Sequence, residues 1–387
     1  MVKSAESPKW LFVASSVNML LGLCSIPLLS WLIGSEVLGQ YQEFLAFAII
    51  AGPIAAGRLE AGVLSGDNGP ALWAGILIAV AVFIVTLAFL PFYFDRFYMA
   101  GLLPFFILSY ALMVLAKAAG LKRKKYKLVS FLDVIYTFSY LVLPAAFFKF
   151  DDPAILIGFA MIVFQFLYFI VFFGVVGAGR FCFYKAVIYI REKCSMSFLL
   201  VALTLVNGIS LQLPIFFMSE RFEYALMGAF LLANRVLNIP VAVVSQPVAS
   251  YLESVFSEKN FQTFLKCMLG CLFLSALFSV TCIIVSKIDM KWFFGEGWET
   301  VSIVLIFSVL PKALQMINLP AAKVMNLTRY RALALLVTIF FIPVRWFLME
   351  FYGVDVEGFL MGMMIGATAF YVFYTALALW IVKNEYR

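Results

Sequence analysis

The chain has 387 residues, of which 65% are hydrophobic and only 13% are charged, and its formal net charge is +7. Soluble domains are about half apolar, so this composition excludes an ordinary soluble protein and predicts one embedded in a lipid bilayer. Histidine is absent and no GxxxxGK[ST] phosphate-binding loop occurs, so we expect no catalytic triad, no metal site and no cofactor.

Twelve apolar segments follow one another along the chain, each long enough to cross a hydrocarbon core of about 30 Å as a helix. The period-two pattern of a membrane barrel is absent, so we predict an all-α polytopic membrane protein with twelve transmembrane helices. The predicted spans are 10–33, 41–65, 71–94, 98–118, 128–149, 153–174, 197–218, 223–250, 263–286, 299–320, 330–352 and 356–382.

Basic residues lie unequally on the two sides of these spans. If the N terminus is cytoplasmic, nineteen Lys and Arg residues lie in cytoplasmic segments and five on the other side, while four lie within spans. Because cytoplasmic loops of membrane proteins carry the excess of basic residues, we predict that both termini are cytoplasmic. The net charge is therefore mainly a signal of topology and does not indicate nucleic acid.

A basic run, KRKKYK at 122–127, lies directly after the fourth predicted span. Basic residues next to a membrane are attracted to anionic phospholipids by about 1 kcal/mol each. We interpret the run as an anchor on anionic lipid, and the alternative is a docking surface for an enzyme that hands over the substrate.

The longest polar connection, 175–196, separates six spans from six. Its aromatic and aliphatic side chains alternate with Arg180, Lys185, Arg191 and Lys193, as is typical of an amphipathic helix on the cytoplasmic surface. We therefore predict an N-terminal six-helix lobe over 1–174, an amphipathic linker over 175–196 and a C-terminal lobe over 197–387. Two lobes of six spans have the same orientation, which suits parallel repeats.

A short internal similarity agrees with this division. Ser15 and Asn18 in the first span match Thr204 and Asn207 in the seventh, which continues to Ser210. Each pair places a hydroxyl and an amide three residues apart, on one face of a helix. Ser15, Asn18, Asn207 and Ser210 are candidates for binding sugar. So is Gln315 in the polar stripe of span ten, which consists of Ser308, Lys312, Gln315 and Asn318.

Four basic residues lie inside predicted spans: Arg58, Arg235, Lys312 and Arg345. A basic residue facing lipid at the bilayer centre costs about 3 kcal/mol, so these side chains are expected to face protein or water. They outnumber the acidic residues within spans, which favours an anionic ligand such as a pyrophosphate. The alternative is that they only join helices, as in a pair of Arg345 with Glu350, or of Arg58 with Glu60 of a different helix.

Three acidic residues, Glu43, Glu60 and Asp133, are candidates for a site that couples transport to H⁺ or Na⁺, with helix pairing as the alternative. The loops predicted on the outer side are short, whereas a membrane-embedded glycan polymerase would need a larger loop with paired carboxylates. We therefore expect a transporter and not an enzyme.

The turn between the first two spans, IGSEVLGQY at 33–41, resembles the LGxxxxGxY turn of polysaccharide and O-antigen flippases of the Wzx family, with Ile33 in place of the usual Leu. Three further segments resemble the same family: ANRV at 233–236, FFGEGW at 293–298 and NLTRY at 326–330. Together with twelve spans and a midpoint linker, these similarities extend over the whole chain.

The resemblance implies the fold of the multidrug/oligosaccharidyl-lipid/polysaccharide exporter superfamily, in which two six-helix lobes rock around a central cavity. It implies a bacterial inner membrane protein that moves an undecaprenyl-pyrophosphate-linked oligosaccharide, such as an O-antigen unit for lipopolysaccharide, from the cytoplasmic to the periplasmic leaflet. Basic residues of spans two and eight line the cavity in such flippases, and Arg58 and Arg235 lie in the corresponding spans. A polysaccharide polymerase and glycosyltransferases are the implied protein partners.

Two other functions stay open. A multidrug antiporter of the same superfamily would export organic cations and would require carboxylates in its cavity. A membrane-embedded glycan polymerase belongs to a different class and would change the chain length of the surface glycan without changing export of the unit.

Overall fold

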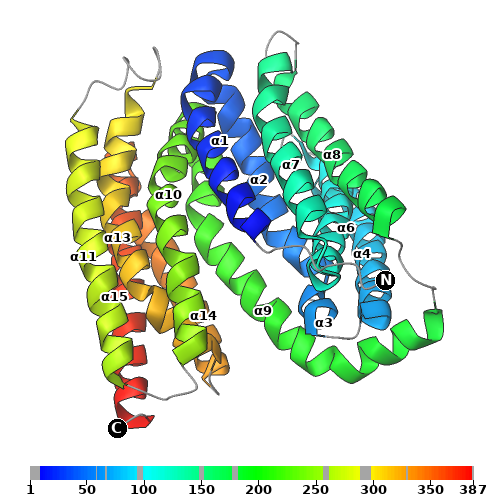
Figure 1. Cartoon of the computed structure of the whole chain (residues 1–387). Helices are drawn as coiled ribbons and strands as arrows, with labels where there is room; N and C mark the ends of the chain where they lie inside the picture. The colour runs from blue at the N-terminus through cyan, green and yellow to red at the C-terminus, as the bar shows by residue number, and fades with distance from the viewer. Residues whose placement is uncertain are drawn as a thin grey trace. The chain divides into compact units, whose positions relative to one another are not determined.

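The computed structural model describes residues 9–57, 59–65, 68–93, 99–147, 152–176, 182–255, 261–287, 298–327 and 330–385, and within these ranges all regular secondary structure is helical (Figure 1). The chain divides into two compact units, Met1–Gly208 (unit 1) and Ile209–Arg387 (unit 2). The division falls within α9, Phe183–Arg221.

Unit 1 is built around α6, Leu103–Lys122, which packs against α2, α3, α4, α7 and α8 and is the most buried helix of the unit. The first helix, α1, packs along α7. Gly120 lets α6 approach its neighbours closely, because a Cβ there would lie 2.5 Å from a Val129 side-chain atom and 2.6 Å from Phe172. The other elements are α1 Lys9–Ile33, α2 Ser35–Ala55, α3 Glu60–Ser65, α4 Asn68–Ala88, α5 Leu90–Tyr93, the 3₁₀ helix η1 Ala100–Leu102, α7 Tyr126–Phe147 and α8 Pro153–Val176.

The predicted single span over 41–65 is wrong, because the helix is interrupted. Gly57 has a φ of +58°, a left-handed conformation that glycine adopts without steric cost, and α2 ends just before it. A new helix, α3, begins at Glu60. Glu60 therefore starts a separate helix and does not continue α2.

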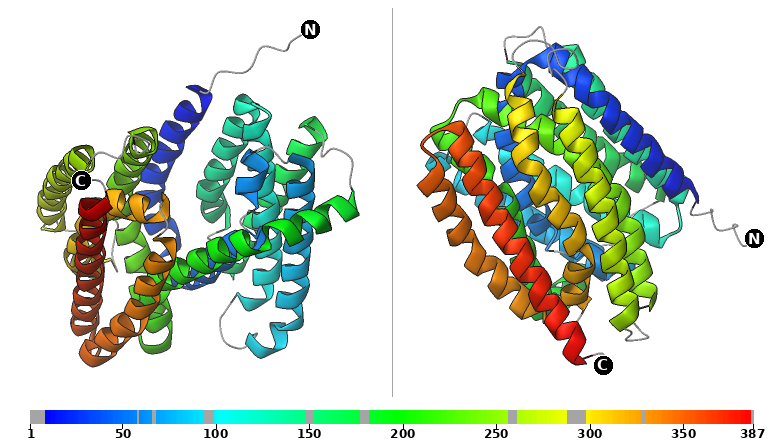
Figure 2. Two further views of the ribbon diagram at one scale, coloured as in Figure 1. Left: turned by 90° about the horizontal axis from the view of Figure 1, so that it is seen from below. Right: turned by 90° about the vertical axis from the view of Figure 1, so that its left-hand side faces the viewer.

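Unit 2 is organised around α13, Thr300–Leu327, which packs against α10, α11 and α15 (Figure 2). α14 packs along α15, and the C-terminal part of α9 completes the unit. The remaining bounds are α10 Tyr224–Val255, α11 Phe261–Ser286, α14 Arg331–Tyr352 and α15 Val356–Glu385.

Three glycines on α15, Gly358, Gly362 and Gly366, are spaced four residues apart on one face. A Cβ at Gly362 would lie 2.4 Å from the carbonyl oxygen of Leu348 in α14, and a Cβ at Gly366 would lie 3.3 Å from the Cα of Arg345. Small residues at such spacing allow two helix backbones to approach closely inside a membrane. The α14–α15 pair is therefore packed backbone against backbone.

Eight helices of the described residues are long and apolar enough to cross a membrane: Gly69–Ala88, Ala100–Lys122, Pro153–Val175, Phe198–Arg221, Phe264–Ser286, Thr300–Ala322, Arg331–Tyr352 and Val356–Asn384. They coincide with eight of the predicted spans. The other four predictions, 10–33, 41–65, 128–149 and 223–250, fall on α1, on α2 with α3, on α7 and on α10.

The predicted linker does not form a helix of its own. Residues 183–196 continue without a break into the apolar part of α9. Near the start of α9, the exposed side chains include Phe183, Tyr184 and Val187 as well as Lys185, Arg191 and Lys193, while Ala186 and Tyr189 are buried. The prediction of an amphipathic segment on the cytoplasmic surface stays a prediction.

Candidate functional site

The candidate site of unit 2 lies where α10 and α13 pack together. Arg235 and Asn238 are three residues apart, so they share a face of α10. Lys312 reaches this face from α13, and its Nζ donates a hydrogen bond of 2.7 Å to Asn238 Oδ1. Asn238 is exposed on the surface of the unit, while Lys312 and Arg235 are half-buried. The structure thus brings Lys312 to the helix that carries Arg235.

The charge of Lys312 is not neutralised by this contact. Asn238 supplies a neutral acceptor, and no carboxylate of the described residues forms an ion pair with Lys312. A hydrogen bond to an amide satisfies one donor of the ammonium group but leaves its full charge. In a membrane-spanning helix such a charge requires water or an anion nearby, because facing lipid would cost about 3 kcal/mol.

The polar stripe predicted on span ten is divided between two environments. At the C-terminal end of the stripe, Asn318 is 6% exposed, and its Oδ1 accepts a hydrogen bond of 3.1 Å from the hydroxyl of Thr375 of α15. Ser308 is also buried, whereas Gln315 is half-buried like Lys312. Asn318 therefore joins two helices, and only Lys312 and Gln315 stay available to a ligand.

Arg345 lies in the middle of α14 and is 7% exposed. Its Nη1 donates two hydrogen bonds to Ser210 of α9, one of 2.7 Å to the backbone carbonyl oxygen and one of 2.8 Å to Oγ. The predicted alternative pair of Arg345 with Glu350 is wrong, because Glu350 instead pairs with Arg221 at 2.5 Å. Arg345 and Ser210 were predicted as separate ligand groups, and the structure brings them into contact.

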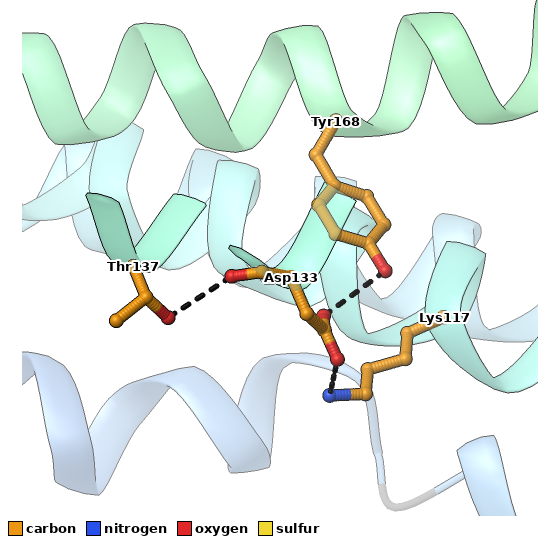
Figure 3. Close-up of polar contacts among 4 residues, drawn as sticks. All are labelled: Lys117, Asp133, Thr137 and Tyr168. Atoms are coloured by element: carbon orange, nitrogen blue, oxygen red, sulfur yellow. Dashed lines mark hydrogen bonds and ion pairs between the residues drawn. The ribbon is translucent and has the colours of Figure 1, made fainter. Parts of the chain in front are cut away.

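A polar network in unit 1 joins α6, α7 and α8 through Asp133 (Figure 3). Lys117 of α6 pairs with Asp133 Oδ2 at 2.6 Å, and the hydroxyl of Tyr168 donates a hydrogen bond of 3.2 Å to Oδ1. Thr137 donates to the backbone carbonyl of Asp133 at 2.9 Å. The carboxylate predicted as a candidate for ion coupling is thus held by a cation and a phenol.

A second polar contact joins the same three helices and was missed by the sequence analysis. Gln165 of α8 is fully buried; its Oε1 accepts a hydrogen bond of 2.5 Å from Ser109, and its Nε2 donates one of 3.0 Å to the hydroxyl of Tyr136. The available signal was a single amide within the apolar run 153–176. An amide there must bond to another helix, since lipid offers no partner.

The other predicted residues are dispersed over unit 1. Ser15 is exposed on α1, and Asn18 is half-buried with an Oδ1 that has no hydrogen-bond partner among the described residues. Glu43 is buried in α2 and Asn207 is half-buried in α9. Glu60 is the first residue of α3, and Arg58 lies outside the described residues, as do residues 293–297 and 328–329 of the predicted family segments.

Over the part of the chain that the structure describes, no cluster of three or more acidic or cysteine side chains could hold a metal ion.

No protein-family model and no curated protein matches the sequence. Solved structures do match it in fold. The lipid II flippase MurJ in its inward closed conformation has a TM-score of 0.77 at 13% identity, over 96% of this chain and 87% of that one. An inward-facing multidrug resistance MATE family transporter of the MOP superfamily has a TM-score of 0.64 at 11% identity, over 100% and 98%. The Vibrio cholerae MATE transporter VcmN in the bent form has a TM-score of 0.59 at 14% identity, over 98% of both chains.

These findings define the class of the protein. Its helices and their arrangement are those of a multi-pass membrane protein with the fold shared by MurJ and the MATE transporters of the MOP superfamily. The fold is therefore shared with these solved structures, whereas the division into two lobes of six spanning helices and the closer assignment to O-antigen flippases stay predictions.

Proposed function

We propose that this protein is a flippase for a lipid-linked oligosaccharide whose head carries a pyrophosphate. The observation that carries the proposal is the environment of Lys312, an ammonium group in a membrane-spanning helix whose acceptor is the neutral Asn238 Oδ1 at 2.7 Å. A diphosphate would supply the negative counter-charge that Asn238 does not supply, and its oxygen atoms are strong acceptors for an ammonium group.

Arg235 is the second residue that we assign to the anionic head, since it lies one helical turn from Asn238 on the same face of α10. Gln315, three residues beyond Lys312 on α13 and half-buried, is suited to bind a sugar hydroxyl. Arg58 is included on the strength of its sequence position alone.

We assign the undecaprenyl carrier and the direction of transport from the sequence motifs that resemble those of Wzx-type flippases. The fold supports them in one respect, because MurJ is named as a lipid II flippase. We propose an O-antigen or similar repeat unit as the cargo, moved from the cytoplasmic to the periplasmic leaflet of a bacterial inner membrane, with both termini in the cytoplasm.

The exposed basic and aromatic side chains near the start of α9, within residues 183–193, suit the surface of an anionic membrane.

Two residues of the basic run at 122–127 make contacts within unit 1. Lys122 Nζ donates a hydrogen bond of 3.0 Å to the carbonyl oxygen of Leu64 near the end of α3, and Lys127 lies 5.5 Å over the ring of Trp10. Lys124 is exposed, and we propose anionic phospholipid as its partner.

The test is the variant Lys312→Met, which keeps the length of the side chain and removes the charge. We expect it to lower export of the lipid-linked unit by about ten- to a hundredfold, as for the loss of a charged hydrogen bond of about 1.5 to 3 kcal/mol. The measurement is surface polysaccharide in a strain that carries only the variant, together with the amount of folded protein in the membrane.

Lys287→Met is the matched control, because Lys287 is exposed in the turn after α11, and it should export normally. Normal export by Lys312→Met at a normal protein level would contradict the proposal. A multidrug antiporter is the second candidate because MATE transporters share the fold. This second function would be favoured if deletion of the gene abolished resistance to cationic dyes and left the surface polysaccharide unchanged.

A further inference from the structure

Pro214 lies inside α9 and leaves a gap in its hydrogen bonding. In an α-helix the carbonyl oxygen of each residue accepts a hydrogen bond from the N–H four residues later. Proline has no N–H, so the residue four positions before it loses its donor. In this helix that residue is Ser210.

Arg345 of α14 provides the missing donor. Its Nη1 lies 2.7 Å from the carbonyl oxygen of Ser210 and 2.8 Å from Oγ of the same residue. The carbonyl that the proline leaves without an intrahelical donor is thus the one that the guanidinium group binds. A buried arginine, whose desolvation is unfavourable, has a structural reason to be at this position.

α15 provides room for the arginine side chain. Gly366 faces Arg345, and a Cβ at this position would lie 3.1 Å from its Cγ and 3.4 Å from its Cβ. Three helices of unit 2 therefore build this contact: α9 supplies the acceptor, α14 the donor and α15 the space.

The proline gap lies close to the boundary between the two compact units. Unit 1 ends at Gly208 and unit 2 begins at Ile209, one residue before Ser210. α9 is thus the covalent connection between the units, and its hydrogen bonding is interrupted within the first turns after the boundary. A helix bends most easily where such a bond is missing.

We propose that Ser210 and Pro214 form a hinge in α9 and that Arg345 is the latch that holds it. When Nη1 is bound to the Ser210 carbonyl, the helix keeps one direction through the gap. When Arg345 leaves, α9 bends at this point. This gives Arg345 a positioning role in place of the predicted contact with pyrophosphate, and it does not depend on which molecule is transported.

The experiment combines a double-mutant cycle with a distance measurement along α9. Spin labels at positions 198 and 220, both exposed on α9, are about 33 Å apart if the helix is straight. They are introduced as cysteines after replacement of the six native cysteines. The variants are Arg345→Met, Pro214→Ala and the two combined, each purified as the full chain.

Arg345→Met should broaden or shift the 198–220 distance distribution and lower the temperature of unfolding. Pro214→Ala restores an N–H to position 214, so the helix can satisfy the Ser210 carbonyl by itself. Adding it to Arg345→Met should return the distribution to that of the unsubstituted protein. Pro320→Ala, at a proline inside α13, is the matched control and should not rescue.

Two results would overturn the proposal. One is an unchanged distance distribution in Arg345→Met. The other is a double variant whose distance distribution is as broad, or whose unfolding temperature is as low, as that of Arg345→Met alone. Arg345 would then have a role other than to supply the donor that Pro214 lacks. Neither readout uses a substrate, so a failure of the proposed transport function would not affect the result.

Discussion

A lysine of unit 1 and two cations of unit 2 differ in the groups that accept their hydrogen bonds. In unit 1, Lys117 meets the carboxylate of Asp133 at 2.6 Å, and a phenol completes the group. In unit 2, Lys312 meets an amide oxygen and Arg345 meets a backbone carbonyl and a hydroxyl. The acceptors satisfy the geometry of all three donors, but only that of Lys117 also cancels the charge. In unit 2 the carboxylate of Glu350 cancels the charge of Arg221, near the end of α9, and not that of Lys312 or Arg345.

This difference separates two tasks that a buried cation can have. A charge that is cancelled locally joins helices and needs nothing further. A charge that is hydrogen-bonded but not cancelled retains its attraction for an anion, and this attraction is strong where little water screens it. Unit 2 is therefore the part of the chain in which we look for anionic cargo.

The largest expected effect comes from reversing the charge in unit 2. Lys312→Glu places a carboxylate beside Asn238, where it repels the anionic head, and we expect export to fall by about a hundredfold or more. Surface polysaccharide and the accumulated lipid-linked precursor are the measurements. Near-normal export by the folded variant would show that the unbalanced charge has no role in binding.

A neutral contact in unit 1 should produce the next largest effect, on stability alone. Gln165→Leu deprives Ser109 of an acceptor and Tyr136 of a donor, and we expect the free energy of unfolding to fall by about 2 kcal/mol. Thermal unfolding in detergent is the measurement. Gln315→Leu, in which a half-buried amide with no hydrogen bond among the described residues is replaced, should change it by less than about 0.5 kcal/mol.

The balanced pair in unit 1 should have the smallest effect. Asp133→Asn removes the charge opposite Lys117, but both side chains are partly exposed, 19% and 43%, so we expect a loss of only about 1 kcal/mol. Export should stay within about threefold of normal. A much larger loss of export, with a changed dependence on external pH or Na⁺, would instead identify Asp133 as the ion-coupling residue and remove the contrast between the units.

The fold could be predicted further than the site. Long apolar runs fix the class and most spans, because a helix is the simplest way to satisfy a backbone in lipid. The helix break at Gly57 was missed, since glycine within an apolar run also occurs in continuous membrane helices. The continuity of α9 through residues 183–221 was missed because a polar stretch is no obstacle to a helix that leaves the membrane.

The candidate site could be predicted less completely, because it is formed by residues that are distant in the sequence. Arg345 and Ser210 are 135 positions apart, and composition gives no hint that they meet. One step was within reach, because Pro214 alone implies that the Ser210 carbonyl needs an external donor. Which arginine provides it depends on the packing of α14 against α9, and the sequence of one chain does not define this.

The glycines of α15 have a practical consequence for mutagenesis. A methyl group at Gly362 would overlap the Leu348 carbonyl oxygen, 2.4 Å away, and neither backbone can move without parting the two helices. A systematic alanine replacement of this protein would therefore report Gly362 as indispensable for export, although the defect would arise in assembly of the helix pair. A mutational screen for residues that recognise the cargo should therefore first measure how much of each variant protein is in the membrane. Glycines that are needed only for helix packing can then be set apart from residues that contact the cargo.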